Sequence, residues 1–204
     1  MSPIIYCISE GEADDDNFSR VKPRIVAAIA AASACGITHF QIREKKLMAA
    51  NLFTLAAEAA IVARECDVKL LVNGRADIAV AAGADGVHLP ADGLPAAVVR
   101  RLVPAGFLIG VSTHSFEEVA EARDAGADLA VFGPVFSSPG KGDGVGLAKL
   151  AAVCSKFAPF PVVALGGINE TRVEAVIGAG AAGYAAIRYL NRCINDGVSL
   201  AHFE

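Results

Sequence analysis

Short aliphatic runs recur along this chain and alternate with stretches that have the spacing of amphipathic helices. The runs cover residues 4–8, 39–43, 69–72, 86–89, 108–112, 129–133, 161–165 and 183–187. Runs of this kind, rich in valine, isoleucine and leucine, predict buried strands. Helical spacing follows in residues 21–34, 47–64, 94–102, 116–125, 147–157 and 170–179. Regular alternation of strands and helices predicts a mostly parallel sheet.

The length of the repeating unit limits which architectures are possible. Dividing 204 residues among eight strands gives about 25 residues per unit, which suits a single-domain (β/α)8 TIM barrel spanning residues 1–204. Gly36, Gly83, Gly126 and Gly180 stand just after helical stretches, where a left-handed residue is expected to close a helix. A doubly wound open sheet is the alternative, because periodicity alone does not distinguish the two.

Composition limits the location and the partners. The longest apolar stretch, residues 25–37, is shorter than the roughly 18 residues that a membrane helix needs, and the first residues form no secretion signal. We therefore expect a cytoplasmic protein without membrane contact. A net charge of −4 without a basic stripe argues against nucleic acid, and five scattered cysteines argue against a disulfide framework or a zinc site. A small phosphorylated ligand and a homo-oligomer remain open.

Binding and catalytic residues of a parallel barrel lie at the carboxyl ends of its strands. Gly166 and Gly167 follow the predicted strand 161–165, and Asn169 is the expected N-cap of the next helix, so backbone N–H groups without partners would form a phosphate site there. Arg188, after Ile187 in the last strand, would clasp the same phosphate. Alternatively, the glycines form just a tight turn and Arg188 is a surface charge. The same rule selects Asn73 and Ser112.

The second strand carries alternating side chains. Gln41 and Arg43 share one face and Phe40 and Ile42 the other, so the polar pair is predicted to face the barrel interior. Lys45 adds a second cation, and together these groups predict an anion site. The alternative is that Arg43 pairs with a carboxylate such as Glu44 or Asp77.

His114 follows the fifth strand and precedes a predicted capping box, Ser115 with Glu118. Imidazole exchanges protons near neutral pH, so His114 is the candidate general acid and base; a packing role is the alternative. His39, His88 and His202 have no comparable partners in the sequence. Residues 134–146, rich in glycine, serine and proline, predict a lid that brings Lys141 to an anion, or else a plain surface loop.

These segments resemble the thiamine-phosphate synthase/TenI superfamily over residues 3–190. The resemblance is carried by QIREK at 41–45, VNGRADIA at 72–79, GADGVHL at 83–89, GVSTHS at 110–115, GPVF at 133–136 and VALGGI at 163–168. It implies a TIM barrel that acts on a thiazole phosphate in thiamine biosynthesis. It also implies that the glycines after strand seven and the end of strand eight hold the phosphate.

The superfamily contains a magnesium-dependent synthase and a metal-independent thiazole tautomerase. Synthases resemble one another in two aspartates, one in Asn-Asp-Arg after strand three and one in a Gly-Gln-x-Asp stretch after strand four. Here Gly74 and Gly93 stand at those positions, with Asp92 one residue early. The resemblance therefore implies a tautomerase with His114 as general acid and base, and with neither metal nor cofactor.

The chain departs from the family's pattern at two positions, and two functions other than the tautomerase remain as alternatives. Arg188 replaces a small residue at the family's phosphate position, and Gly140 replaces a hydroxyl residue of the synthase loop, of which Ser138 and Lys141 are kept as expected substrate-binding residues. The first alternative is thiamine-phosphate synthase, which joins a pyrimidine diphosphate to thiazole phosphate, with Asp92 recruited for Mg²⁺. The second is a ligand-sensing barrel without catalysis.

Overall fold

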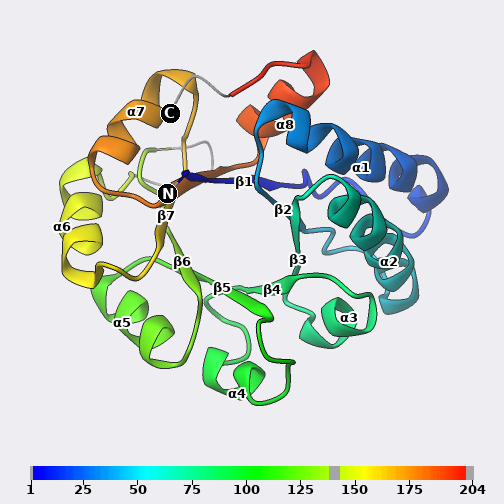
Figure 1. Ribbon diagram of the computed structural model, residues 1–204, viewed down its shortest axis with the longest axis horizontal. Coiled ribbons are helices and arrows are strands. Elements are labelled where there is room, and N and C mark those ends of the chain that lie inside the picture. The colour runs from blue at the N-terminus through cyan, green and yellow to red at the C-terminus, as the bar shows by residue number, and fades with distance from the viewer. Residues whose placement is uncertain (1, 138–142, 201–204) are drawn as a thin grey trace.

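Eight parallel strands close into a barrel in the computed structural model, which describes residues 2–137 and 143–200 (Figure 1). The strands are β1 (Ile4–Ile8), β2 (His39–Ile42), β3 (Lys69–Asn73), β4 (Gly86–Leu89), β5 (Leu108–Thr113), β6 (Leu129–Phe132), β7 (Val162–Leu165) and β8 (Gly183–Ala186). Each strand pairs with the next, and β8 pairs with β1. The predicted TIM barrel is confirmed, and the open sheet is excluded.

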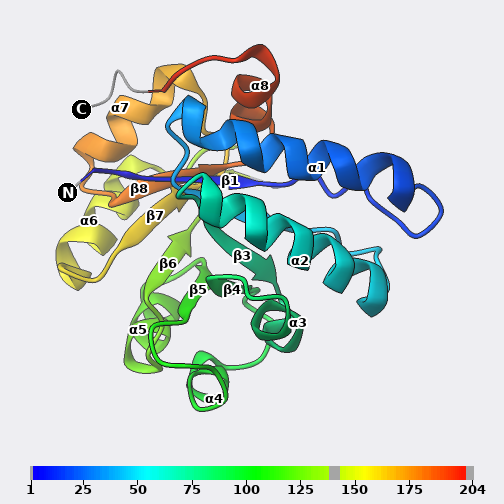
Figure 2. The same cartoon turned by 45° about the vertical axis from the view of Figure 1, so that its right-hand side comes forward.

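Helices surround the barrel on its outer side (Figure 1). They are α1 (Phe18–Ala32), α2 (Ala49–Glu65), α3 (Ala76–Ala81), α4 (Ala96–Arg100), α5 (Phe116–Asp124), α6 (Leu147–Phe157), α7 (Glu170–Gly178) and α8 (Arg188–Asp196), with a short 3-10 turn, η1 (Ser33–Cys35). In Figure 2, α1 and α2 lie side by side along one flank. The predicted helical stretches do not include α3, which has 6 residues, or α8, although the polar and apolar residues of α8 have amphipathic helical spacing.

The predicted helix-closing glycines adopt the expected backbone conformation. Gly36, Gly83, Gly126 and Gly180 have φ between +71° and +88°. A side chain at such a φ is strained, so glycine suits these turns. Each turn then leads the chain into the next strand.

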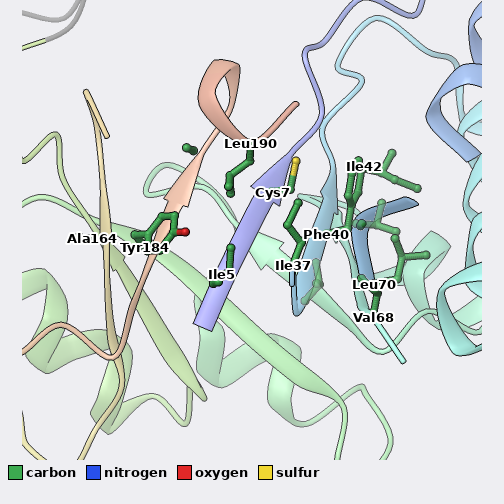
Figure 3. Packing of buried hydrophobic residues seen from close by; sticks show 14 of the residues in the cluster. Ile5, Cys7, Ile37, Phe40, Ile42, Val68, Leu70, Ala164, Tyr184 and Leu190 are labelled. Atoms are coloured by element: carbon green, nitrogen blue, oxygen red, sulfur yellow. The ribbon is translucent and has the colours of Figure 1, made fainter. Parts of the chain in front are cut away.

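Alternation along the strands divides the buried residues into two layers. The outer layer, between strands and helices, includes Phe40 and Ile42 (Figure 3). The inner layer fills the barrel with side chains such as Tyr6 and Leu71. Gln41 is buried and faces the interior, as predicted. Polar side chains on the barrel's inner face near the strand ends, such as Gln41, can therefore meet a ligand.

Most buried apolar side chains lie inside the barrel or between the strands and the helices. Within the described residues, no helix is both long and apolar enough to span a bilayer. All five cysteines are free thiols, and all except Cys66 are buried.

Candidate active site

A cavity of about 830 Å³ opens at the carboxyl ends of the strands. The loops that follow the strands form its rim. The predicted site residues within the described ranges all line it, namely Gln41, Arg43, Lys45, Asn73, Ser112, His114, Gly166, Gly167, Ile187 and Arg188. Ser138 and Lys141, predicted in the lid, lie outside the described residues. The barrel has therefore brought together residues that are far apart in the sequence.

The two glycines after β7 are required by close packing. Gly166 has φ +104°, and a Cβ there would lie 2.5 Å from Cα of Pro134. Gly167 has φ +64°, and its Cβ would lie 2.8 Å from the carbonyl oxygen of Ser137. The tight-turn interpretation is thus correct for their local role. Because the same glycines line the cavity, they leave room for a ligand beside the backbone.

Asn169 and Arg188 lie beside the two glycines at the predicted phosphate site. Asn169 occupies the N-cap position of α7, but its side chain caps no backbone N–H; instead it accepts a hydrogen bond from Thr171 Oγ1 at 3.0 Å. Arg188 is the first residue of α8 and is exposed at the cavity rim. Its guanidinium forms no ion pair with the described part of the chain and is free to meet an anion.

The carboxylates proposed as alternative partners of Arg43 are engaged elsewhere. Glu44 accepts hydrogen bonds from the backbone N–H groups of Gly11, at 3.1 Å, and Ala13, at 2.7 Å. Asp77 pairs with Arg75, Oδ2 to Nη2 at 2.6 Å, and this hydrogen bond lowers the pKa of the Asp77 carboxyl. Within residues 2–137 and 143–200, Arg43 forms no ion pair. Its charge therefore remains available to a bound anion.

His114 lies at the rim and is oriented by Glu118. Glu118 Oε2 accepts hydrogen bonds from the His114 backbone N–H at 2.7 Å and lies 3.0 Å from its Nδ1. Ser115 Oγ accepts the Glu118 backbone N–H at 3.2 Å, as the capping box predicts. The return contact of the box goes to His114 instead of Ser115. The contact with Glu118 engages Nδ1 of the His114 imidazole and leaves Nε2 available to a substrate.

His88 was expected to lack partners, and that expectation is wrong. It is buried on the inner face of β4, with Nε2 2.8 Å from Ser112 Oγ and Nδ1 3.3 Å from the Tyr6 hydroxyl. Desolvation, followed by the nearby charge of Arg43, lowers the pKa of His88 to about 4. His88 is thus a neutral imidazole at physiological pH. Its inward position follows from alternation with Val87 and Leu89, the one sequence signal that pointed to it.

The cavity offers few groups to a metal ion. Asp92, exposed on the loop after β4, is the only carboxylate among the lining residues that the structure describes, and this part of the chain holds no cluster of three or more His, Cys, Asp or Glu suited to a metal. Mg²⁺ that is bound with a substrate diphosphate uses one or two protein carboxylates. Asp92 meets the lower limit of that requirement.

Comparisons with known proteins agree on one family. A family model described as thiamine monophosphate synthase matches residues 5–190. A Geobacter sulfurreducens protein named "Putative thiamine-phosphate synthase" is 46% identical over 166 residues, which cover 80% of this chain and 78% of that protein. A thiamine-phosphate synthase of Methanoculleus marisnigri is 41% identical, covering 76% and 75%. The solved structure of a thiamine phosphate pyrophosphorylase from Pyrococcus furiosus superposes with a TM-score of 0.79 at 30% identity, covering 95% and 92%.

Proposed function

Because the chain belongs to the thiamine monophosphate synthase family, we propose that it catalyses the synthase reaction, in which a hydroxymethylpyrimidine diphosphate is joined to a thiazole phosphate. Membership of this family makes it an enzyme of thiamine biosynthesis. The names of its relatives favour a transferase. The thiazole tautomerase predicted from the sequence finds no support in those names.

One structural observation carries the proposal, namely three cations that line the cavity without a carboxylate partner in the described ranges. They are Arg43, Lys45 and Arg188. Both substrates of the synthase reaction are phosphorylated, so the cavity and the ligands have opposite charges. Cations held in a partly enclosed cavity bind phosphate groups more strongly than cations in bulk water.

In the reaction, the thiazole ring nitrogen attacks the pyrimidine methylene carbon while the bond from that carbon to the diphosphate oxygen breaks. Negative charge develops on the leaving diphosphate, and Arg43 and Lys45 would stabilise it. Gly166, Gly167 and Arg188 would hold the phosphate of the thiazole. Asp92 would hold Mg²⁺, which supplies further positive charge to the diphosphate when bound.

The tautomerase is a second candidate, favoured by one observation. Asp92 is the single cavity carboxylate in the described ranges, whereas His114 with Glu118 forms a pair suited to proton transfer. Isomerisation would move a proton from one carbon of a carboxythiazole phosphate to another, and His114 would carry it. A His114→Ala variant would then lose isomerase turnover.

A direct assay separates these candidates. The purified protein is incubated with hydroxymethylpyrimidine diphosphate and thiazole phosphate, with Mg²⁺ or with EDTA, and thiamine phosphate and diphosphate are measured. We expect product to form with Mg²⁺. Isomerisation of a carboxythiazole phosphate without diphosphate release would overturn the synthase in favour of the tautomerase. Binding of thiazole phosphate with neither turnover would indicate the ligand-sensing barrel.

A further inference from the structure

A row of hydrogen bonds crosses the barrel interior and ends at the cavity. Gln41 Nε2 donates to the Tyr6 hydroxyl oxygen at 3.1 Å, and that hydroxyl lies 3.3 Å from His88 Nδ1. His88 Nε2 lies 2.8 Å from Ser112 Oγ. Tyr6 is fully buried and does not line the cavity, whereas Ser112 does. The row therefore links a buried phenol to a side chain that a ligand can touch.

The donor and acceptor properties of these side chains determine which atom donates in each hydrogen bond of the row. The Tyr6 oxygen already accepts from Gln41, so the single phenolic proton needs an acceptor, since an unpaired buried donor costs about 1–3 kcal/mol. Within the described ranges, His88 Nδ1 is the remaining partner of that hydroxyl. Burial raises the pKa of Tyr6, so the phenol keeps its proton at neutral pH. Tyr6 therefore donates to a bare Nδ1.

The neutral imidazole then carries its one proton on Nε2. Because desolvation lowers the pKa of His88, the ring does not hold a second proton at neutral pH. The Nε2–H donates to Ser112 Oγ, whose acceptor capacity on that side is then used. The hydroxyl proton of Ser112 has no acceptor in the described part of the row and is left for the cavity.

We propose that Tyr6 and His88 are positioning residues that make Ser112 a hydrogen-bond donor to an anionic oxygen of the bound substrate. The anionic class follows from Arg43, Lys45 and Arg188, which line the same cavity. That Ser112 donates to an anionic substrate oxygen rests on the proposed function. The donor-to-acceptor direction of the hydrogen bonds from Tyr6 through His88 to Ser112 does not depend on that function.

The first test reads the tautomer of His88 directly. Long-range ¹H–¹⁵N spectra of the ¹⁵N-histidine-labelled full chain distinguish a proton on Nε2 from one on Nδ1, and the His88 signal is the one lost in His88→Gln. We expect the Nε2–H tautomer at neutral pH, and a change of tautomer in Tyr6→Phe. An Nδ1–H tautomer in the unsubstituted protein would reverse the row and overturn the proposal, whether or not the enzyme turns over.

The second test measures ligand binding with a matched control. Tyr6→Phe and Tyr184→Phe each remove one buried hydroxyl, but Tyr184 has no hydrogen-bond partner in the described ranges. We expect the Kd for inorganic diphosphate, measured by calorimetry, to rise about tenfold in Tyr6→Phe and to stay unchanged in Tyr184→Phe. Equal effects would contradict the positioning role, because loss of packing alone would affect both.

A double-mutant cycle completes the argument. Ser112→Ala should weaken binding of the same probe about tenfold, Ser112→Thr should retain most of the affinity, and Tyr6→Phe combined with Ser112→Ala should be no weaker than Ser112→Ala alone. Additive losses would show that Tyr6 acts independently of Ser112, against the proposal. If inorganic diphosphate does not bind to the unsubstituted protein, the anion site and the donor role of Ser112 both fail, while the spectra still report on the row.

Discussion

Tyr6 and Tyr184 lie on neighbouring strands and are both buried, yet they have opposite surroundings. Tyr6 faces the barrel interior, where Gln41 and His88 engage its hydroxyl. Tyr184 pairs in register with Ile5 and faces the outer apolar layer, where its hydroxyl has no partner in the described ranges (Figure 3). The comparison teaches that the inner face organises polar groups toward the cavity, whereas the outer face contributes packing.

Arg43 lines the cavity and Arg75 does not, and replacing these two arginines gives the largest expected difference between groups that face the ligand and groups that do not. Arg43→Ala should lower kcat/KM about 100- to 1000-fold, because an unpaired cation at the anion site is lost. Arg75→Ala should change kcat/KM less than about threefold, because Arg75 is already bound to Asp77 on the protein surface. Steady-state kinetics of the two variants test this, and equal losses would contradict the assignment of Arg43.

Two glycines with positive φ extend the comparison to the backbone. Gly166→Ala should lower the free energy of unfolding by about 2–4 kcal/mol, because its Cβ would overlap Pro134 on the cavity wall. Gly106→Ala, before β5 at the opposite end of the barrel, meets no atom within 4 Å at φ +80° and should lose about 1 kcal/mol. Urea unfolding measures both, and a tolerated Gly166→Ala would mean that the wall is not closely packed.

Buried histidines should make stability depend on pH. The folded-state pKa is lowered to about 4 by desolvation for His88 and also for His39, whereas an unfolded histidine titrates near pH 6.5. The unfolded chain therefore binds more protons between these values, and stability falls as the pH drops from about 6.5 to about 4.

Replacing His88 tests how much this residue contributes to the pH dependence of stability. His88→Gln should reduce the loss of unfolding free energy between about pH 7 and pH 5 by about 1–2 kcal/mol. Urea unfolding at both pH values measures this, and an unchanged slope in His88→Gln would show that His88 is not buried as a neutral ring.

Replacing each of the two tyrosines with phenylalanine is expected to give the smallest changes in the free energy of unfolding. Tyr6→Phe should lower the free energy of unfolding by about 1–2 kcal/mol, because Gln41 and His88 lose a buried partner. Tyr184→Phe should be neutral or slightly stabilising, because it removes a buried hydroxyl without a hydrogen bond. Thermal and urea unfolding supply the comparison. A larger loss in Tyr184→Phe would mean that its hydroxyl is satisfied in solution.

Local patterns were sufficient for much of the fold and for the location of the site. The alternation of Phe40, Gln41 and Ile42 predicted which side chains face inward, and the structure agrees. The rule for strand ends placed Arg43, Ser112 and Gly166 in one cavity. It did not reveal the partners of His88, since a histidine on an inward face has no neighbour that can be read from adjacent residues.

By itself, the sequence left a barrel and an open sheet as alternatives, and it predicted the alternation of strands and helices and the face that each strand residue presents. These are local properties, because backbone geometry alternates side chains every second residue and glycine allows the turns that close helices. Only the tertiary structure decided that His88 meets Tyr6, 82 positions away in the chain, and that Glu44 is held by a loop and leaves Arg43 unpaired. Such pairings depend on the register and closure of all eight strands, which no single segment encodes.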